Sequence, residues 1–172
     1  VYNSVTNVTT FTLPYADAGE FSVVKGSTWA ANAGARITVT RGVSDTTVEA
    51  TGDFSTSPCL VGRNYEMRYR FSEQHVRDQK GVAVQSANLV LRNMSVSYAD
   101  SGFFQVEVTP RGRGKYTYKF TGGVIGDISA TIGKVSIASG SFKFPVRTKS
   151  KGALIDIVSN NHLPCKFQAA EW

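Results

Sequence analysis

Residues 88–120 read NLVLRNMSVSYADSGFFQVEVTPRGRGKYTYKF. Apolar side chains recur here at every second position in three runs, which are separated by Asp100-Ser101-Gly102 and by the turn-rich residues 110–114. Because successive side chains of a β-strand point to opposite faces, this spacing places one face of each run in a core. The runs are Leu89 and Leu91; Phe104, Val106 and Val108; and Tyr116, Tyr118 and Phe120.

The same pattern extends along the chain and predicts an all-β fold. Phe142 with Phe144 and Ile155 with Ile157 repeat the spacing of two, and Gly, Ser and Thr interrupt every window long enough for a helix. We expect an antiparallel β-sandwich-like fold with short strands, Gly/Ser turns and little helix, because hairpin-length connections cannot make parallel crossovers. The predicted strands are residues 7–13, 20–24, 35–40, 46–50, 64–71, 88–98, 103–109, 115–121, 127–132, 134–138, 141–147, 153–158 and 163–168.

Two strand pairings are expected from adjacent runs. Residues 88–98 should pair with 103–109 across Asp100-Ser101-Gly102, and residues 134–138 should pair with 141–147 across Ser139-Gly140-Ser141. Both connections contain a glycine, which reverses a chain at low steric cost.

The length of 172 residues predicts one all-β domain or two small β subdomains over 1–172, with a candidate boundary in the polar stretch 74–87. The chain does not begin with Met, so we expect an excised or processed piece of a longer protein. No apolar run approaches the ~20 residues of a membrane-spanning helix, and no signal peptide is expected.

Residues with catalytic or metal-binding chemistry are few and scattered. Cys59 and Cys165 are far apart in sequence and are predicted to be reduced, buried thiols, with their pairing left open. His75 and His162 have no metal-ligand spacing around them. Asp100 and Glu107 are the best-spaced carboxylates for glycoside hydrolysis, although a turn role explains Asp100 more simply. We expect no catalytic residues, no metal and no cofactor.

Positive charge is concentrated in the second half of a chain whose formal net charge is +6. This concentration predicts contact with a polyanion or an acidic partner subunit, and a merely solvated basic face remains the alternative. The candidate contact residues are Arg111, Arg113, Lys115, Lys149 and Lys151. The full set between 111 and 151 also includes Lys119, Lys134, Lys143 and Arg147, against the single acid Asp127.

Exposed aromatic rings would indicate a different function, because sugar-binding modules stack sugars on Trp and Tyr. Trp29 lies in an Ala/Gly-rich loop and is the candidate exposed aromatic residue. Alternating aromatics such as Tyr116 and Tyr118 are better explained by core packing, since they carry the largest area that a strand can bury.

Several sequence elements in residues 88–172 resemble one known family. Their order is similar to that in the C-terminal region of the tail nozzle proteins (tail tubular protein B) of short-tailed podovirus-type bacteriophages. Upstream, Gly62-Arg63-x-Tyr65 running into Tyr69-x-Phe71-Ser72 resembles the family more faintly, and residues 1–60 match only in strand-rich texture. The elements are Leu89-x-Leu91-Arg92, Val96-x-Tyr98-x-x-Ser101-Gly102-x-Phe104, Lys115-Tyr116-Thr117, Gly140-x-Phe142-x-Phe144-Pro145-Val146 and Glu171-Trp172.

The resemblance implies a structural virion protein without enzymatic activity. Because the chains of the family are several times longer, it also implies that this chain is a C-terminal fragment. It implies a ring of six copies at the distal end of the tail, a channel through which the genome is ejected, contacts with the tail adaptor and tail fibres, and synthesis in the host cytoplasm. DNA would pass through the channel without sequence-specific binding. A carbohydrate- or receptor-binding β-sandwich module is the second interpretation, and a polysaccharide hydrolase is the third.

Overall fold

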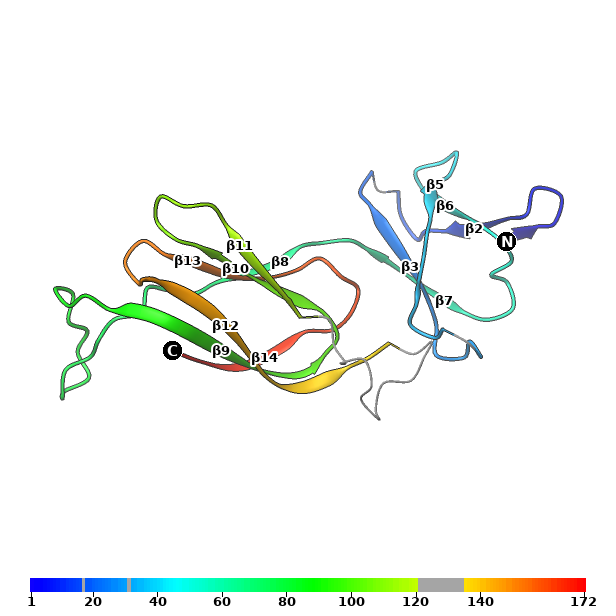
Figure 1. Cartoon of the computed structure of the whole chain (residues 1–172). Helices are drawn as coiled ribbons and strands as arrows, with labels where there is room; N and C mark the ends of the chain where they lie inside the picture. Colours follow the sequence, from blue (N-terminus) through cyan, green and yellow to red (C-terminus); the bar gives the residue numbers. More distant parts are fainter. Residues whose placement is uncertain (17, 31, 121–134) are drawn as a thin grey trace. The chain divides into compact units, whose positions relative to one another are not determined.

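The computed structural model describes residues 1–16, 18–30, 32–120 and 135–172, and no helix occurs among them. The chain forms two compact units, Val1–Tyr65 with Val124–Ser136, and Glu66–Gly123 with Ile137–Trp172. All strand pairs found in the described residues are antiparallel. The predicted all-β, antiparallel, sandwich-like fold is therefore confirmed (Figure 1).

The first unit contains two small sheets around its own core. One sheet has the order β1-β2-β6-β5 and the other the order β4-β3-β7. Their core consists of Leu13, Phe21, Val23, Ile37, Val48 and Ala50. The strands are β1 (Tyr2–Asn3), β2 (Val8–Thr12), β3 (Phe21–Lys25), β4 (Arg36–Ile37), β5 (Thr40–Arg41), β6 (Thr47–Thr51) and β7 (Cys59–Arg63).

The second unit is a sandwich of a four-stranded and a three-stranded sheet. The four-stranded sheet has the order β11-β10-β13-β8, and the three-stranded sheet has the order β12-β9-β14 (Figure 1). The strands are β8 (Met67–Arg70), β9 (Val90–Ser101), β10 (Phe104–Thr109), β11 (Tyr116–Phe120), β12 (Ala138–Lys149), β13 (Leu154–Ser159) and β14 (Lys166–Glu171).

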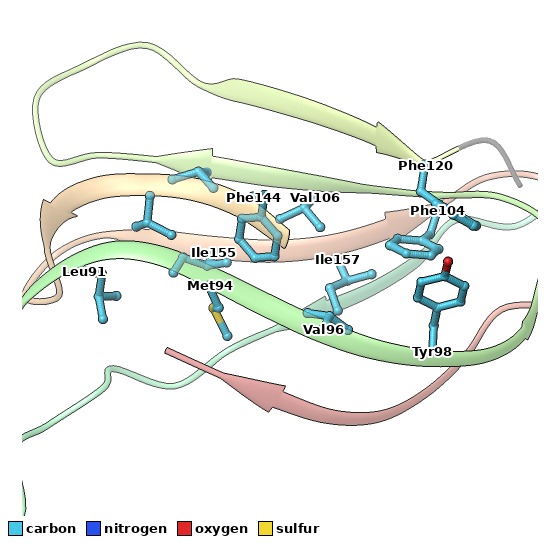
Figure 2. Packing of buried hydrophobic residues seen from close by; sticks show 12 residues of the cluster. Leu91, Met94, Val96, Tyr98, Phe104, Val106, Phe120, Phe144, Ile155 and Ile157 are labelled. Carbon is cyan, nitrogen blue, oxygen red and sulfur yellow. The ribbon is translucent and has the colours of Figure 1, made fainter. Parts of the chain in front are cut away.

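The inward faces of these two sheets hold most of the apolar positions that alternate in the sequence, but Tyr116, which was expected in the core, is 50% exposed. Figure 2 shows Tyr98 of β9 pointing toward Phe104 of the opposite sheet. Met94 and Val96 of β9 belong to the same buried cluster as Phe104 and Ile157. Phe104 is fully buried, and its ring packs against the rings of Tyr98, Phe120, Phe142 and Phe167 at centroid distances from 4.7 to 5.5 Å. Burial of these large apolar side chains is the main stabilising contribution to the unit.

Both expected hairpin pairings are wrong. The segments 88–98 and 103–109 lie in opposite sheets, since β9 pairs with β12 and β14 whereas β10 pairs with β11 and β13. The chain crosses the sandwich at Gly102, whose backbone N–H donates to the carbonyl of Pro164. Apolar alternation marks a strand's buried face but does not say whether the next strand continues the same sheet or covers the opposite one.

The second wrong pairing concerns the segment around Gly140. Residues 138–149 form one long strand instead of a hairpin, and Gly140 pairs with Tyr98 inside it. A Cβ at Gly140 would lie 3.2 Å from the Tyr98 hydroxyl oxygen, so glycine provides room for a buried tyrosine rather than a turn. The predicted strand 127–132 and residue 134 of the predicted strand 134–138 lie outside the described residues.

Smaller differences affect the first unit and the loop before β9. The expected strand 35–40 is divided between β4 and β5, which belong to different sheets, and the strand β7 was not expected. The polar stretch 74–87 lies within the second unit, where Arg77 forms an isolated antiparallel bridge with Ala83.

Candidate functional site

The outer face of the four-stranded sheet carries a cluster of charged side chains. Asp156 of β13 is paired with Arg70 of β8 on one side and with Glu107 of β10 on the other. Ile155 and Ile157, the neighbours of Asp156, point into the core, so the alternation of β13 sends the carboxylate outward. Asp156 and Glu107 are nevertheless buried, because longer side chains from neighbouring strands cover them.

Arginine and lysine side chains neutralise both carboxylates. Arg70 donates from Nε and Nη2 to the two oxygens of Asp156 at 2.7 and 2.8 Å. Arg68 Nη1 connects the carboxylates, donating to Asp156 Oδ2 at 2.9 Å and to Glu107 Oε2 at 3.0 Å. Lys115 Nζ donates to Glu107 Oε1 at 2.8 Å. We call Arg68, Arg70, Glu107, Lys115 and Asp156 the charge ladder, because it joins four adjacent strands or strand ends.

These contacts keep the two acids ionised. The hydrogen bond from Lys115, followed by the contact with Arg68, lowers the pKa of Glu107, and the hydrogen bonds from Arg70 and Arg68 lower the pKa of Asp156. In turn, the hydrogen bonds to the carboxylates of Glu107, Asp156 and Glu66 raise the pKa of Arg68. A general acid for glycoside hydrolysis needs a raised carboxyl pKa. Because both carboxyl pKa values are lowered here, the charge ladder is better suited to holding neighbouring strands together than to donating a proton.

Asp100 and Glu107, the candidate hydrolase pair, belong to opposite sheets and have separate partners. Asp100 lies at a bulge of β9, where the register against β12 shifts, and its φ is 44°. Its carboxylate forms an ion pair of 3.0 Å with Lys166 Nζ. Each carboxylate thus has a local electrostatic role in the strand pairing around it.

The structure separates the five basic residues that the sequence grouped together. Lys115 belongs to the charge ladder. Arg111 and Arg113 lie exposed in the β10–β11 turn, and the side chain of Arg111 lies close to Gly152 in the β12–β13 turn. Lys151 lies in that second turn, and its Nζ donates to the carbonyl of Gln85. We call Arg111, Arg113 and Lys151 the basic turns.

Lys149 belongs to a different surface, the outer face of the three-stranded sheet. There it joins Arg92 of β9 and Lys143 and Arg147 of β12, all of them exposed. We call Arg92, Lys143, Arg147 and Lys149 the basic face. The sequence interpretation omitted Arg92 because it lies outside the charge-rich segment and reaches this face only through the pairing of β9 with β12.

Trp29, the candidate exposed aromatic residue, is partly buried in the first unit. Its indole Nε1 donates to the carbonyl of Pro58 at 3.0 Å, and its ring lies 6.1 Å from that of Phe54. Lys25 Nζ lies 4.8 Å from the ring centroid, within cation–π range. The indole therefore already has a hydrogen-bond acceptor, an aromatic neighbour and a cation.

The cysteine and histidine residues form no shared site in the described part of the chain. Both thiols are free and partly buried, and burial raises the pKa of Cys59 and of Cys165. His75 Nε2 lies 3.9 Å from Glu73 Oε2, and His162 is exposed in the turn before β14. Within residues 1–16, 18–30, 32–120 and 135–172, no three His, Cys, Asp or Glu side chains are grouped so that they could hold a metal ion.

The family described as bacteriophage nozzle protein matches residues 1–172. The chain belongs to the bacteriophage nozzle protein family. The family resemblance inferred from residues 88–172 is thereby confirmed, and the match also covers residues 1–60, where only strand-rich texture was noticed.

A curated relative of this nozzle-family chain is the tail tubular protein gp12 of Escherichia phage T7. The two are 24% identical over 133 residues, which cover 75% of this chain and 17% of the relative. The chain thus spans less than a fifth of the length of that relative.

Sequence reasoning missed three residues of the charge ladder in this nozzle-family chain, Arg68, Arg70 and Asp156, and it had considered Glu107 only as a candidate for glycoside hydrolysis. Arg68 and Asp156 are 88 positions apart, and Arg68 and Glu107 are 39 apart. The available signal was a polar residue inside an apolar run, as in Leu154-Ile155-Asp156-Ile157, since such a residue usually has a partner on an adjacent strand.

Proposed function

We propose that this chain is a structural part of a phage tail nozzle. The single observation that carries this proposal is the match of the bacteriophage nozzle family over residues 1–172. The relative named tail tubular protein gp12 supports a place in the virion tail. The described residues suit a load-bearing scaffold: each unit has its own apolar core, and the charge ladder fastens one sheet of the second unit.

In the proposed assembly, six copies form a ring at the distal end of the tail, and the genome leaves through the channel that they enclose. The protein is made in the host cytoplasm and contacts the tail adaptor and the tail fibres. It carries out no catalysis, which agrees with Glu107 and Asp156 being held ionised by basic neighbours. No helix in the described residues is long and apolar enough to cross a membrane.

The basic turns are proposed to contact an acidic surface of a neighbouring subunit or a fibre. Arg111 and Arg113 are exposed beside each other, and neither side chain has an ion pair among the described residues. Lys115, the third residue of this hairpin, is directed into the charge ladder, so its contribution is to hold the sheet beneath the turn.

Native mass spectrometry of tails that carry the full-length protein tests the proposed ring. We expect six copies per particle, and another stoichiometry would contradict the six-fold arrangement.

A glycan array with the 172-residue chain separates this function from the carbohydrate-binding interpretation, because a tail scaffold should show no selective sugar binding. Saturable binding to one glycan class, lost in Trp29→Ala, would favour the sugar-binding module instead.

A further inference from the structure

The basic face is produced by the pairing of β9 with β12. β9 is the central strand of its sheet, so an exposed side chain on it, such as Arg92, points away from the core. On the edge strand β12, Lys143 pairs directly with Ser95 and Lys149 pairs with Val90. The inward positions between them, Phe144 and Val146, are buried, so the alternation of β12 directs the lysines outward.

A backbone irregularity brings Arg147 to the same surface. Between Pro145 and Thr148 the register of β12 against β9 shifts, so that Val146 and Arg147 together oppose Arg92. Arg147 has a φ of 50°, in the left-handed region that residues other than glycine rarely adopt. Bulges commonly redirect a side chain at a functional surface, and a strained non-glycine residue at such a position suggests a role for its side chain.

The cations of the basic face lack internal counterions. Within the part of the chain that the structure describes, Arg92, Lys143, Arg147 and Lys149 take part in no ion pair. Glu171 of β14 is paired with Ser95 on the far side of β9 and is the acid of this face. The face therefore has a net charge of +3, and it differs from the charge ladder, where every cation forms an ion pair with an acid.

The other side chains of the face favour a phosphate polymer over a protein partner. Between the cations lie small polar groups, namely Asn93, Ser95, Ser97 and Ser141, and the apolar residues paired with members of this outer face between β9 and β12 are Val90 and Pro145. Protein interfaces need aromatic or apolar anchors, which here line a separate groove of about 570 Å³ containing Tyr69, Phe71 and Trp172. Arg, Lys, Ser and Asn are the side chains that contact phosphate and sugar oxygens.

The length of the face also fits a linear polyanion. Lys143 and Lys149 are six residues apart on one strand, which corresponds to roughly 20 Å at the rise of a β-strand. Duplex DNA presents one phosphate per about 3.4 Å of axis on each strand, so this length spans about six phosphates. Four cations over that distance can neutralise several of them.

We infer that the basic face binds the sugar–phosphate backbone of duplex DNA without reading the bases. The inference rests on the proposed function only in that the channel would bring DNA to the protein. The binding surface itself is formed by residues of this chain. Clustered cations gain affinity by releasing counterions from DNA, so the interaction is expected to weaken steeply as salt is raised.

Fluorescence anisotropy of the 172-residue chain with labelled 20-base-pair duplexes, from 25 to 200 mM NaCl, tests this inference. The variant Arg92→Ser/Lys143→Ser/Lys149→Ser should bind at least about tenfold more weakly at the lowest salt, and the slope of log K against log salt should fall by about 2 to 3. The matched control is Arg36→Ser/Lys80→Ser/Lys119→Ser, which removes the same charge from exposed positions elsewhere. It should bind nearly as well as the parent.

Three results would overturn the inference. Equal weakening by both triple variants would mean that net charge alone governs binding. A clear preference between duplexes of equal length and different sequence would contradict backbone recognition. Tighter binding of a polyglutamate peptide than of DNA would assign the face to an acidic protein. Native mass spectrometry of the assembled tail reports ring formation separately, and we expect it to be unchanged by the basic-face variant.

Discussion

Arg70 and Asp156 face each other across β8 and β13, and the guanidinium donates from two nitrogens to the two carboxylate oxygens at 2.7 and 2.8 Å. This bidentate pair fixes the edge strand β8, which has a single neighbour in its sheet, to the central strand β13. Arg68, two residues earlier on β8, extends the attachment to Glu107 on β10. The charge ladder thus holds an edge strand with side-chain bonds in addition to the backbone ladder.

Asp156→Asn should lower the free energy of unfolding by about 1 to 3 kcal/mol, because it leaves two arginines without their buried charged acceptor. Urea denaturation followed by tryptophan fluorescence or circular dichroism measures this change. Glu171→Gln is the matched control, since it removes an exposed acid that has no ion pair among the described residues, and it should change stability by no more than about 0.5 kcal/mol. A loss of similar size in both variants would mean that the ladder contributes nothing specific.

Acid should destabilise the protein through the same two carboxylates. Glu107 and Asp156 have pKa values lowered by Lys115, Arg68 and Arg70, so in the folded state they hold their charge to lower pH than in the unfolded chain. Their contribution is fully present above the ordinary carboxyl pKa of about 4 and is lost as the pH falls through the folded values. The melting temperature should therefore decrease as the pH is lowered from 6 to 2.5, and thermal unfolding measured across this range checks the prediction.

The double variant Glu107→Gln/Asp156→Asn provides the control for this loss of stability in acid. It should be less stable than the parent at pH 6 and should lose less stability on going to pH 2.5, because two of the titrating groups are gone. An unchanged pH dependence would show that other carboxylates, such as Asp53 with its bonds from Ser55, dominate acid unfolding.

The sequence predicted which faces are buried more successfully than which strands are neighbours. Phe104 and Phe142 were both expected in a core, and their ring centroids lie 5.5 Å apart there, yet the two residues come from opposite sheets. The alternation of apolar residues at every second position is a property of a single strand. The sheet that the next strand joins depends on the hydrogen bonds of the residues between the two strands. Between β9 and β10, the Gly102 N–H donates to the Pro164 carbonyl, and the chain passes to the opposite sheet.

For the candidate site, the sequence showed where charge is concentrated but not where it points. Lys115 and Lys149 were grouped by their place in one basic segment, and they lie on the outer faces of different sheets. Arg92 joins Lys149 only because β9 and β12 are adjacent. Contacts between residues tens of positions apart leave no trace in local spacing, and a single sequence carries no covariation that would reveal them.

Phe104→Ala should lower the free energy of unfolding by about 3 to 5 kcal/mol, since it removes a fully buried ring that contacts aromatic residues of both sheets. Chemical denaturation of the 172-residue chain measures the loss. Tyr116→Ala is the control, because Tyr116 is 50% exposed on β11, and it should cost clearly less. Equal costs would contradict the position of Phe104 at the centre of this core.

Gly152 connects backbone conformation with the position of the basic turns. Its φ is 76°, and a Cβ there would lie 3.1 Å from Arg111 Cδ. Gly152→Ala should therefore destabilise the second unit by about 1 kcal/mol, through the strain of a left-handed alanine and the displacement of Arg111. Gly62→Ala is the matched control: a Cβ at Gly62 meets nothing within 4 Å, its φ is not positive, and the change should be neutral or slightly stabilising. Thermal unfolding of the two variants distinguishes the cases, and a Gly152→Ala protein as stable as the parent would show that this turn relaxes to another conformation and that Arg111 is not held by it.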